Sequence, residues 1–257
     1  MEVRPMRVAV VIPARYASTR LPAKPLLRDT GKYLIQHTYE QAARAKCGAD
    51  VIVATDDERI YDAVRSFGGR VVMTRVDHVS GTDRIAEVAT HLAADVILNV
   101  QGDEPQIEPA ALDLLAGLLA DPGTDMATLA VPIHSREAYL DPNVVKVVCD
   151  NQGRALYFSR RPIPMVRDGE PDFTARPARF LQHLGVYAYQ KEFLLTIAGT
   201  EPHPLEQAEK LEQLRVLGTG GTIRVGIVEQ AHRGIDTPAD YAHFVQTVLD
   251  GTTRRAA

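Results

Sequence analysis

The chain has 257 residues, of which 45% are hydrophobic, and its formal net charge is -4. This length suits one large domain or two small ones, and the acidic balance argues against a nucleic-acid binder, which is usually basic over a whole face. The two cysteines, Cys47 and Cys149, form neither a metal-ligand spacing nor a disulfide framework. No apolar run reaches the ~18 residues that span a bilayer, and the polar residues 1–5 indicate no signal peptide. A reducing, cytoplasmic location is therefore expected.

The first half of the chain alternates strand and helix patterns. Continuous β-branched runs are typical of strands that are buried on both faces of a parallel sheet. Such runs predict strands at residues 7–12, 50–54, 70–74 and 95–100. Apolar residues at helical spacing predict helices at residues 32–47, from 55–57 onward, at 81–92 and at 109–119. This βαβ repetition predicts an α/β fold with a mostly parallel sheet and right-handed crossovers.

The second half of the chain has a less regular pattern. Strands are predicted at residues 126–132, 144–149, 155–158, 180–190 and 222–228, and helices at 205–217 and 238–249. The turn sequence DNQG at 150–153 favours a hairpin between two of these strands. Residues 160–180 are rich in Pro, Arg and Gly and predict a long loop, for which closure as a lid is one hypothesis. We therefore expect one domain with an antiparallel insertion at about 132–190.

A cationic loop follows the first predicted strand. The sequence PARYASTRLPAKPL at 13–26 contains Arg15, Arg20 and Lys24 between prolines that stiffen the chain. Loops in this position open at the carboxyl edge of a parallel sheet, where α/β folds bind ligands. The chain has neither a P-loop nor a G-x-G-x-x-G motif, so side-chain cations would have to hold a phosphate chain. The alternative is that these are solvated surface cations, and their position after the strand favours the ligand.

Two further segments place carboxylates after apolar strands. In NVQGDEP (99–105), Gly102 permits a close turn and Asp103 is suited to hold Mg²⁺ beside substrate phosphates, although Asp is also common in ordinary turns. In GIDTP (234–238), Asp236 is a second candidate. Asp or Thr before Pro is also a standard helix start, so capping remains an alternative role for this segment. Two carboxylates at one edge would suit magnesium-assisted phosphoryl displacement.

The second half also contains groups that suit a polyhydroxylated acid. Arg160 can pair with a carboxylate, while His183, Glu212 and Gln213 can share hydroxyl groups. A lone His is more often structural, and Glu212 can instead lie on a solvated helix face, paired with a neighbouring Lys or Arg. The pair Asp56-Asp57 lacks the D-x-D spacing of sugar transferases and is better explained as a helix N-cap.

Taken together and in this order, the motifs resemble the 3-deoxy-manno-octulosonate cytidylyltransferase family. The resemblance covers nearly the whole chain and rests on PARYASTRLPAKPL, VATDD, MTRVDHVSGTDR, NVQGDEP, HLGVYAY, PLEQAEKLEQLRVL and GIDTPAD. It implies a three-layer Rossmann-like nucleotide-diphospho-sugar transferase fold, as a single nucleotidyltransferase domain over residues 1–257. One departure is Ala23, which stands where the family loop typically has glycine (RLPGKPL) and which tolerates less backbone freedom.

The resemblance also implies an activity. Family members transfer CMP from CTP to the sugar acid Kdo for lipopolysaccharide biosynthesis and release pyrophosphate, with Mg²⁺ as cofactor. They are usually homodimers, with the interface near the strands at 144–158. The implied roles are: triphosphate binding and catalysis, Arg15 and Lys24; metal binding and catalysis, Asp103 and Asp236; other nucleotide contacts, Arg75, Ser80 and Gln101; sugar binding, Gln101, Arg160, His183, Tyr187, Glu212 and Gln213.

Two alternatives stay open at this point. The acceptor can be 8-amino-Kdo or another sugar acid, such as a sialic acid, since enzymes for these acids share much of the pattern. The chain can also be a non-catalytic nucleotide-sugar binding module, which would explain the cationic loop but would not need both Asp103 and Asp236.

Overall fold

The computed structural model describes residues 6–18, 20–48, 50–230 and 234–256, with side chains described up to Gly251. The polar residues 1–5 therefore lie outside the described residues. The chain divides into two compact units: unit 1 comprises residues 1–113 and 232–257, and unit 2 comprises residues 114–231. Each unit is described by itself, and the single-domain assignment stays a prediction.

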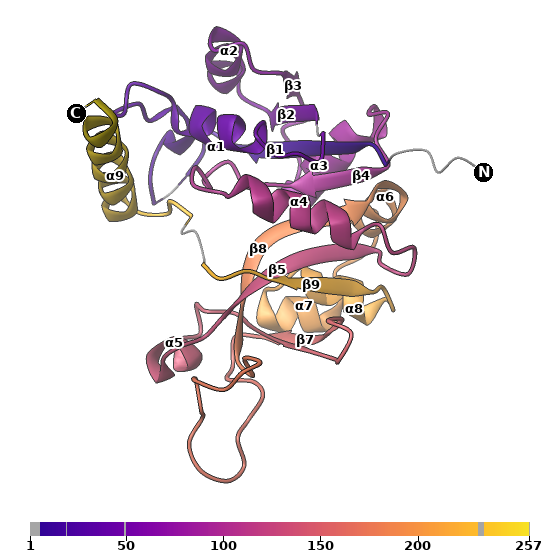
Figure 1. Ribbon diagram of the computed structural model, residues 1–257. Coiled ribbons are helices and arrows are strands. Elements are labelled where there is room, and N and C mark those ends of the chain that lie inside the picture. The colour runs from indigo at the N-terminus through magenta and orange to yellow at the C-terminus, as the bar shows by residue number, and fades with distance from the viewer. Residues whose placement is uncertain (1–5, 19, 49, 231–233, 257) are drawn as a thin grey trace. The chain divides into compact units, whose positions relative to one another are not determined.

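Unit 1 contains a parallel sheet in the strand order β3-β2-β1-β4 (Figure 1). Its strands are β1 (Val8–Ala14), β2 (Asp50–Thr55), β3 (Val71–Met73) and β4 (Val96–Asn99). Each neighbouring pair in this order is parallel. The four strands expected in the first half are thus confirmed. Because β1 lies beside β4, the loops that follow these two strands leave the same edge of the sheet.

The helices α1 (Leu34–Ala42), α2 (Glu58–Ser66) and α3 (Gly81–Thr90) alternate with these strands, and α4 (Pro109–Leu118) follows β4. The side chain of Asp57 accepts a hydrogen bond from the backbone N–H of Arg59, which confirms the predicted N-cap of α2. The closing helix α9 (Pro238–Ala256) is longer than the sequence pattern predicted.

Unit 2 is built mainly from antiparallel pairs. Its strands are β5 (Met126–Pro132), β6 (Lys146–Cys149), β7 (Ala155–Ser159), β8 (Leu181–Gln190) and β9 (Ile223–Ile227). β8 is antiparallel to both β5 and β6, β6 is antiparallel to β7, and β5 is parallel to β9. The predicted hairpin and the antiparallel character of this region are confirmed.

The predicted helix at 205–217 is wrong, because the structure has two helices there. α7 (Pro204–Glu209) ends where Lys210 adopts a left-handed conformation with φ 55°, and α8 (Gln213–Gly218) begins three residues later. A left-handed residue ends a helix and changes the direction of the chain, and the spacing of apolar residues does not reveal where this happens. The short elements η1 (Lys24–Leu26), α5 (Arg136–Leu140) and α6 (Lys191–Ala198) were not predicted either.

The loop over residues 160–180 has no regular helix or strand, as predicted. Figure 1 shows that it extends away from the strands of unit 2. Val166 and Phe173 of this loop pack against the apolar cluster of Ile133, Tyr139 and Phe180.

An apolar cluster in unit 1 brings distant segments together. Leu21 of the cationic loop packs with Leu34 of α1, with Ile235, and with Tyr241 and Phe244 of α9. Burial of these side chains removes apolar surface from water and so holds the segment before α9 against the loop that carries Lys24. Near residues of this cluster in the sequence lie Lys24 and Asp236, which belong to the candidate site in unit 1.

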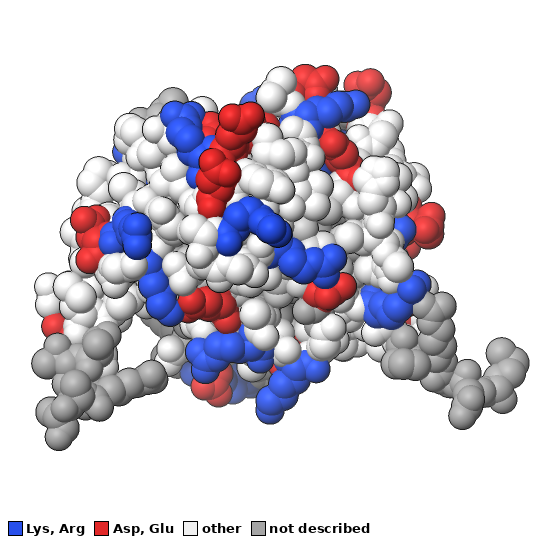
Figure 2. All heavy atoms as spheres, turned by 90° about the horizontal axis from the view of Figure 1, so that it is seen from above, with Lys and Arg blue, Asp and Glu red and all other residues white. Residues whose placement is uncertain are grey.

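Basic and acidic side chains are interspersed over the face of the molecule shown in Figure 2. Within the residues that the structure describes, no helix is both long enough and apolar enough to cross a bilayer.

Candidate active site

Lys24 lies between the two carboxylates that the sequence suggested as metal ligands. Its Nζ donates to Asp103 Oδ2 at 2.5 Å, to the carbonyl oxygen of Ile235 at 2.8 Å and to Asp236 Oδ1 at 3.4 Å. The Lys24 side chain is only 14% exposed. Three segments from different parts of unit 1 thus meet at one ammonium group.

The carboxyl edge of the sheet explains this meeting. β1 and β4 are parallel neighbours, with Val8 opposite Val96. At Gly102, an added Cβ would lie 3.1 Å from the carbonyl oxygen of Pro13 and equally close to Ile35 Cδ1. A side chain at this position would crowd the end of β1, so glycine suits the close approach of the loop after β4. The predicted role of Gly102 and the shared edge are both confirmed.

The segment GIDTP divides capping and ion pairing between two residues. Thr237 caps α9: its hydroxyl accepts from the backbone N–H of Asp240, and the Asp240 carboxylate accepts from the backbone N–H of Thr237. This reciprocal pair is a capping box. The carboxylate of Asp236 instead accepts from Lys24 and from Arg20, whose guanidinium lies 3.0 Å away. Asp236 is therefore available for site chemistry, because Thr237 does the capping.

Glu104 adjoins the cluster of Lys24, Asp103 and Asp236, although the sequence pattern predicted no role for it. Burial, together with the nearby negative charges of Asp103 and Asp236, raises the pKa of Glu104 to about 7. Its position directly after Asp103 in QGDEP was the available signal. Two carboxylates of this cluster contact Lys24, and the Glu104 carboxyl group lies close enough to all three to feel their charges.

The donor set can be compared with what Mg²⁺ requires. Within the described residues, no group of three or more His, Cys, Asp or Glu has the arrangement of a ready-made metal site. Mg²⁺ is usually held by one or two carboxylates together with substrate phosphates and water. Asp103 and Asp236 supply two such carboxylates on one ammonium group. The residues therefore fit a Mg²⁺ ion that binds together with a phosphate-bearing substrate.

Arg15 connects the cationic loop to the start of α3. Its guanidinium donates to the carbonyl oxygens of His78 at 2.8 Å and Ser80 at 3.1 Å. The Ser80 hydroxyl caps α3 by accepting from the backbone N–H of Asp83. Two segments that the resemblance links to the nucleotide are thus side by side in unit 1.

The remaining nucleotide-assigned residues lie near these segments. Arg75 is exposed and its guanidinium pairs with Asp77 at 3.1 Å, while Gln101 Nε2 donates to Asn99 Oδ1 at 3.3 Å. A buried guanidinium supports the chain at this point, because Arg84 binds the carboxylate of Asp56 at 2.6 Å and also the Thr74 hydroxyl. The nucleotide roles of Arg75, Ser80 and Gln101 stay predictions.

Unit 2 contains a cavity of about 330 Å³ that gathers most of the residues assigned to the sugar. β8 contributes His183 and Tyr187, while Glu212 and Gln213 come from the N-cap and the first residue of α8. The left-handed Lys210, which ends α7, turns the chain so that this segment lines the cavity. Residues distant in sequence therefore meet in one polar concavity.

The groups in this cavity have perturbed properties. Burial lowers the pKa of His183 to about 3, so the imidazole is neutral at physiological pH. Burial and the Glu212 carboxylate raise the pKa of Tyr187, so its phenol stays protonated. Gln213 is 3% exposed, and among the described residues its buried Nε2 has no hydrogen-bond partner. A buried donor without a partner is costly unless a ligand satisfies it.

Arg160 lies beside this cavity but is not among the residues that line it. Its guanidinium donates to backbone carbonyl oxygens, at 2.8 Å to Glu209 and at 3.1 Å to Pro142. The Glu209 carboxylate accepts from the Ser159 hydroxyl at 2.6 Å and from the backbone N–H of Arg160 at 2.9 Å. Arg160 thus holds the end of α7, and its pairing with a substrate carboxylate stays a prediction.

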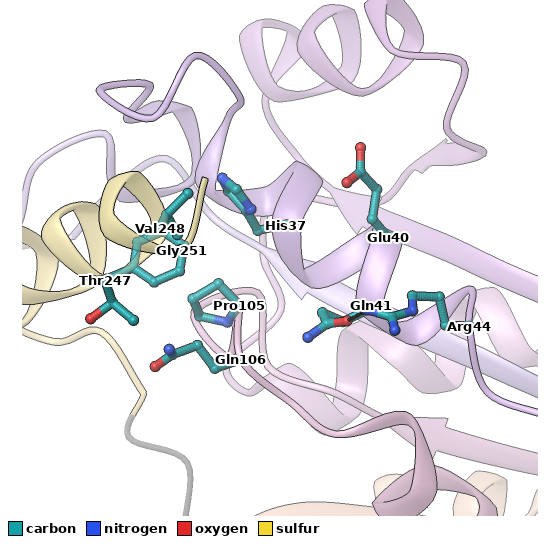
Figure 3. A pocket seen from close by; sticks show the side chains of 10 residues that line it. His37, Glu40, Gln41, Arg44, Pro105, Gln106, Thr247, Val248 and Gly251 are labelled. Atoms are coloured by element: carbon teal, nitrogen blue, oxygen red, sulfur yellow. Dashed lines mark hydrogen bonds between the residues drawn. The ribbon is translucent and has the colours of Figure 1, made fainter. Parts of the chain in front are cut away.

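A larger cavity of about 500 Å³ lies between α1, α9 and the residues after QGDE (Figure 3). Several of its polar side chains have partners within the protein: His37 binds the Thr30 hydroxyl at 2.7 Å, and Arg44 donates to Gln41 at 2.8 Å. The Glu40 carboxylate accepts from Lys32 at 2.6 Å. Because these groups have protein partners, this cavity shows less sign of a ligand than the one in unit 2.

Comparison with known proteins identifies the family. The cytidylyltransferase family matches residues 9–223. This chain belongs to the cytidylyltransferases. Among its relatives, the 3-deoxy-manno-octulosonate cytidylyltransferase of Geobacter metallireducens is 51% identical over 94% of this chain and 97% of its own length. The protein of the same name from Syntrophotalea carbinolica is 52% identical over 91% of this chain and 96% of its own length.

A solved structure agrees with this cytidylyltransferase assignment. A CMP:2-keto-3-deoxy-manno-octonic acid synthetase complexed with CTP is 44% identical and superimposes with a TM-score of 0.88. The match covers 95% of this chain and 99% of that one. The mixed α/β fold with a mostly parallel sheet is therefore confirmed.

Proposed function

We propose that this cytidylyltransferase transfers CMP from CTP to Kdo and releases pyrophosphate. The observation that carries the proposal is the cluster in which Lys24 contacts both Asp103 and Asp236. A binding module would have no need for two carboxylates beside a lysine that binds phosphate. The relatives named for this reaction, and the related synthetase complexed with CTP, supply the substrate identities.

The residues of unit 1 would bind and polarise the triphosphate. Lys24 and Arg15 would stabilise the negative charge that develops on the leaving pyrophosphate. Asp103 and Asp236 would hold Mg²⁺, and Arg75, Ser80 and Gln101 would contact the nucleotide. When bound, Mg²⁺ would supply neutralisation of charge on the phosphates.

The acceptor would bind in the cavity of unit 2. Neutral His183, protonated Tyr187 and the unsatisfied amide of Gln213 offer hydrogen bonds to sugar hydroxyls. The anomeric hydroxyl of Kdo would attack the α-phosphorus of CTP as pyrophosphate leaves in line. Most of the acceleration would come from positioning and electrostatics, with no covalent enzyme intermediate.

The first test is pyrophosphate release from CTP and Mg²⁺ with Kdo, 8-amino-Kdo and a sialic acid, with each nucleoside triphosphate tested in turn. Release with CTP and Kdo alone supports the proposal. Release with a different acid keeps the mechanism and changes the acceptor. If folded protein that binds CTP releases no pyrophosphate with any acid, the binding module is favoured instead.

Substitution at the carboxylate tests the catalytic assignment. Asp103→Asn should lower turnover by roughly 10²–10³-fold, the scale for losing one preorganised charge-stabilising group. Asp50→Asn is the matched control, because Asp50 is 70% exposed and pairs only with Arg70 among the ion pairs that the structure describes. Near-normal turnover of the Asp103 variant at saturating Mg²⁺ would remove this residue from the mechanism.

We further propose that the enzyme is a cytoplasmic homodimer. Neither Cys47 nor Cys149, both within the described residues, forms a disulfide, which fits a reducing compartment. On β7, in the region predicted for the interface, Leu156 is 61% exposed. Sedimentation should show a dimer that Leu156→Glu weakens, and a monomeric wild-type protein would contradict the proposal.

A further inference from the structure

Thr128 lies at an irregularity in the pairing of β5 with β8, where it contacts His183, a residue that lines the unit 2 cavity. Thr128 is opposite Tyr187, but the next residue, Leu129, is opposite Leu184. Gly185 and Val186 are therefore left without partners on β5, as in a β-bulge. Thr128 itself is fully buried, with 0% of its surface exposed.

Three polar groups converge on the Thr128 hydroxyl. Its Oγ1 lies 3.1 Å from the carbonyl oxygen of Leu184, 2.9 Å from that of Val186 and 3.0 Å from Nε2 of His183. A hydroxyl has one proton to donate, and carbonyl oxygens can only accept. The hydroxyl proton is therefore directed to the two carbonyls of the bulge.

This arrangement decides the tautomer of His183. Because the Thr128 proton is used by the carbonyls, the hydroxyl oxygen accepts, and Nε2 of His183 must donate. In a neutral imidazole the other nitrogen, Nδ1, is then an acceptor. Within the described residues, no hydrogen-bond partner of Nδ1 is seen, and His183 lines the cavity.

Aromatic neighbours hold the imidazole plane. The Phe158 ring packs edge-on against His183 with centroids 5.0 Å apart, and the Tyr187 ring lies at 5.5 Å. The ring is thus packed on two sides and hydrogen-bonded at Nε2. Its orientation is fixed before any ligand binds.

We propose that Thr128 is a positioning residue that holds His183 as the Nε2–H tautomer, so that Nδ1 accepts a hydrogen bond from a hydroxyl group of the sugar acid. This inference rests on the proposed function for its ligand. The fixed tautomer makes the cavity selective for the direction of each hydrogen bond. Nδ1 of His183 requires a donor from the ligand, while the unpartnered Nε2 of Gln213 requires an acceptor. A site with such fixed polarity discriminates strongly against an analogue that lacks the matching hydroxyl.

The tautomer can be measured without substrate. Proton–nitrogen correlation NMR of the wild-type imidazoles should show His183 protonated at Nε2, with its signals assigned by their loss in His183→Gln. Thr128→Ser keeps the hydroxyl and should keep this tautomer. Thr128→Val has no oxygen to accept and should lose it. A wild-type His183 protonated at Nδ1, or an unchanged tautomer in Thr128→Val, would overturn the proposal.

Kinetics separate positioning from a structural effect. Thr128→Val should raise the KM for Kdo by about tenfold, the scale of one neutral hydrogen bond, while the KM for CTP changes less than twofold. Thr128→Ser should restore the KM for Kdo to near the wild-type value. Equal effects of the two variants, or a parallel change in both KM values, would contradict a positioning role. Wild-type protein that is inactive with every sugar acid would defeat the proposed function, while the NMR experiment would still test the tautomer.

Discussion

Ala23 provides a test of backbone strain in the loop that carries Lys24. It is the N-cap of η1 and adopts φ 53° and ψ 26°, in the left-handed region that favours glycine. The structure therefore places an alanine where the Cβ atom crowds the following carbonyl oxygen. Replacing it by glycine relieves this crowding without removing a side-chain hydrogen bond.

The size of the effect follows from two opposing terms. A non-glycine residue in the left-handed region destabilises the folded state by roughly 1–2 kcal/mol. Glycine in its place loses more backbone entropy on folding than alanine, which costs about 0.5–1 kcal/mol. Ala23→Gly should therefore raise the free energy of unfolding by about 0.5–1 kcal/mol. For a chain of this size that corresponds to an increase in Tm of about 1–4 °C.

Urea denaturation followed by circular dichroism measures this difference. Ala242→Gly is the matched control, because Ala242 is exposed within α9 of the same unit. There glycine should lower the free energy of unfolding by about 1 kcal/mol. The two substitutions should thus have opposite signs. If Ala23→Gly destabilises the protein as much as the control does, Ala23 is not left-handed and the argument fails.

Three other predictions concern charged and capping groups. Because the pKa of His183 is about 3 in the folded state, below its ordinary value of 6.5, the stability it contributes is present above pH 6.5 and is lost as pH falls below it. Relative to His183→Gln, the wild type should lose about 2 kcal/mol between pH 7 and pH 5 in urea titrations, and a constant difference would contradict this. Lys146→Met should cost about 3–5 kcal/mol, since the buried Nζ donates to three carbonyl oxygens, whereas exposed Lys32→Met should change stability by under about 0.5 kcal/mol. Thr237→Ala should lower stability by about 1 kcal/mol and leave pyrophosphate release intact. Asp236→Asn should instead lower pyrophosphate release and leave stability nearly unchanged. If the two variants have the same effects in both assays, the division of roles between cap and active site is refuted.

The pattern along the chain predicted much of unit 1. Strands buried on both faces have a continuous apolar run, so β1, β2 and β4 could be recognised without knowledge of their neighbours. Because the loops that follow parallel strands lie at one edge of the sheet, the pattern also predicted that Lys24 and Asp103 lie close together, and they form an ion pair. The N-cap of α2 at Asp57 follows from local hydrogen bonding and was equally predictable.

The sequence by itself determined the fold class, the family resemblance and the segments from which the site is built, because periodicity and motifs are properties of consecutive residues. Only the tertiary structure decided that Thr237 caps α9 while Asp236 pairs with Lys24, since both roles suit the same dipeptide. It alone ended α7 at Lys210 and brought Thr128 to His183. These outcomes depend on strand register and on the hydrogen-bond partners that a side chain finds across the fold, which apolar spacing along one segment does not encode.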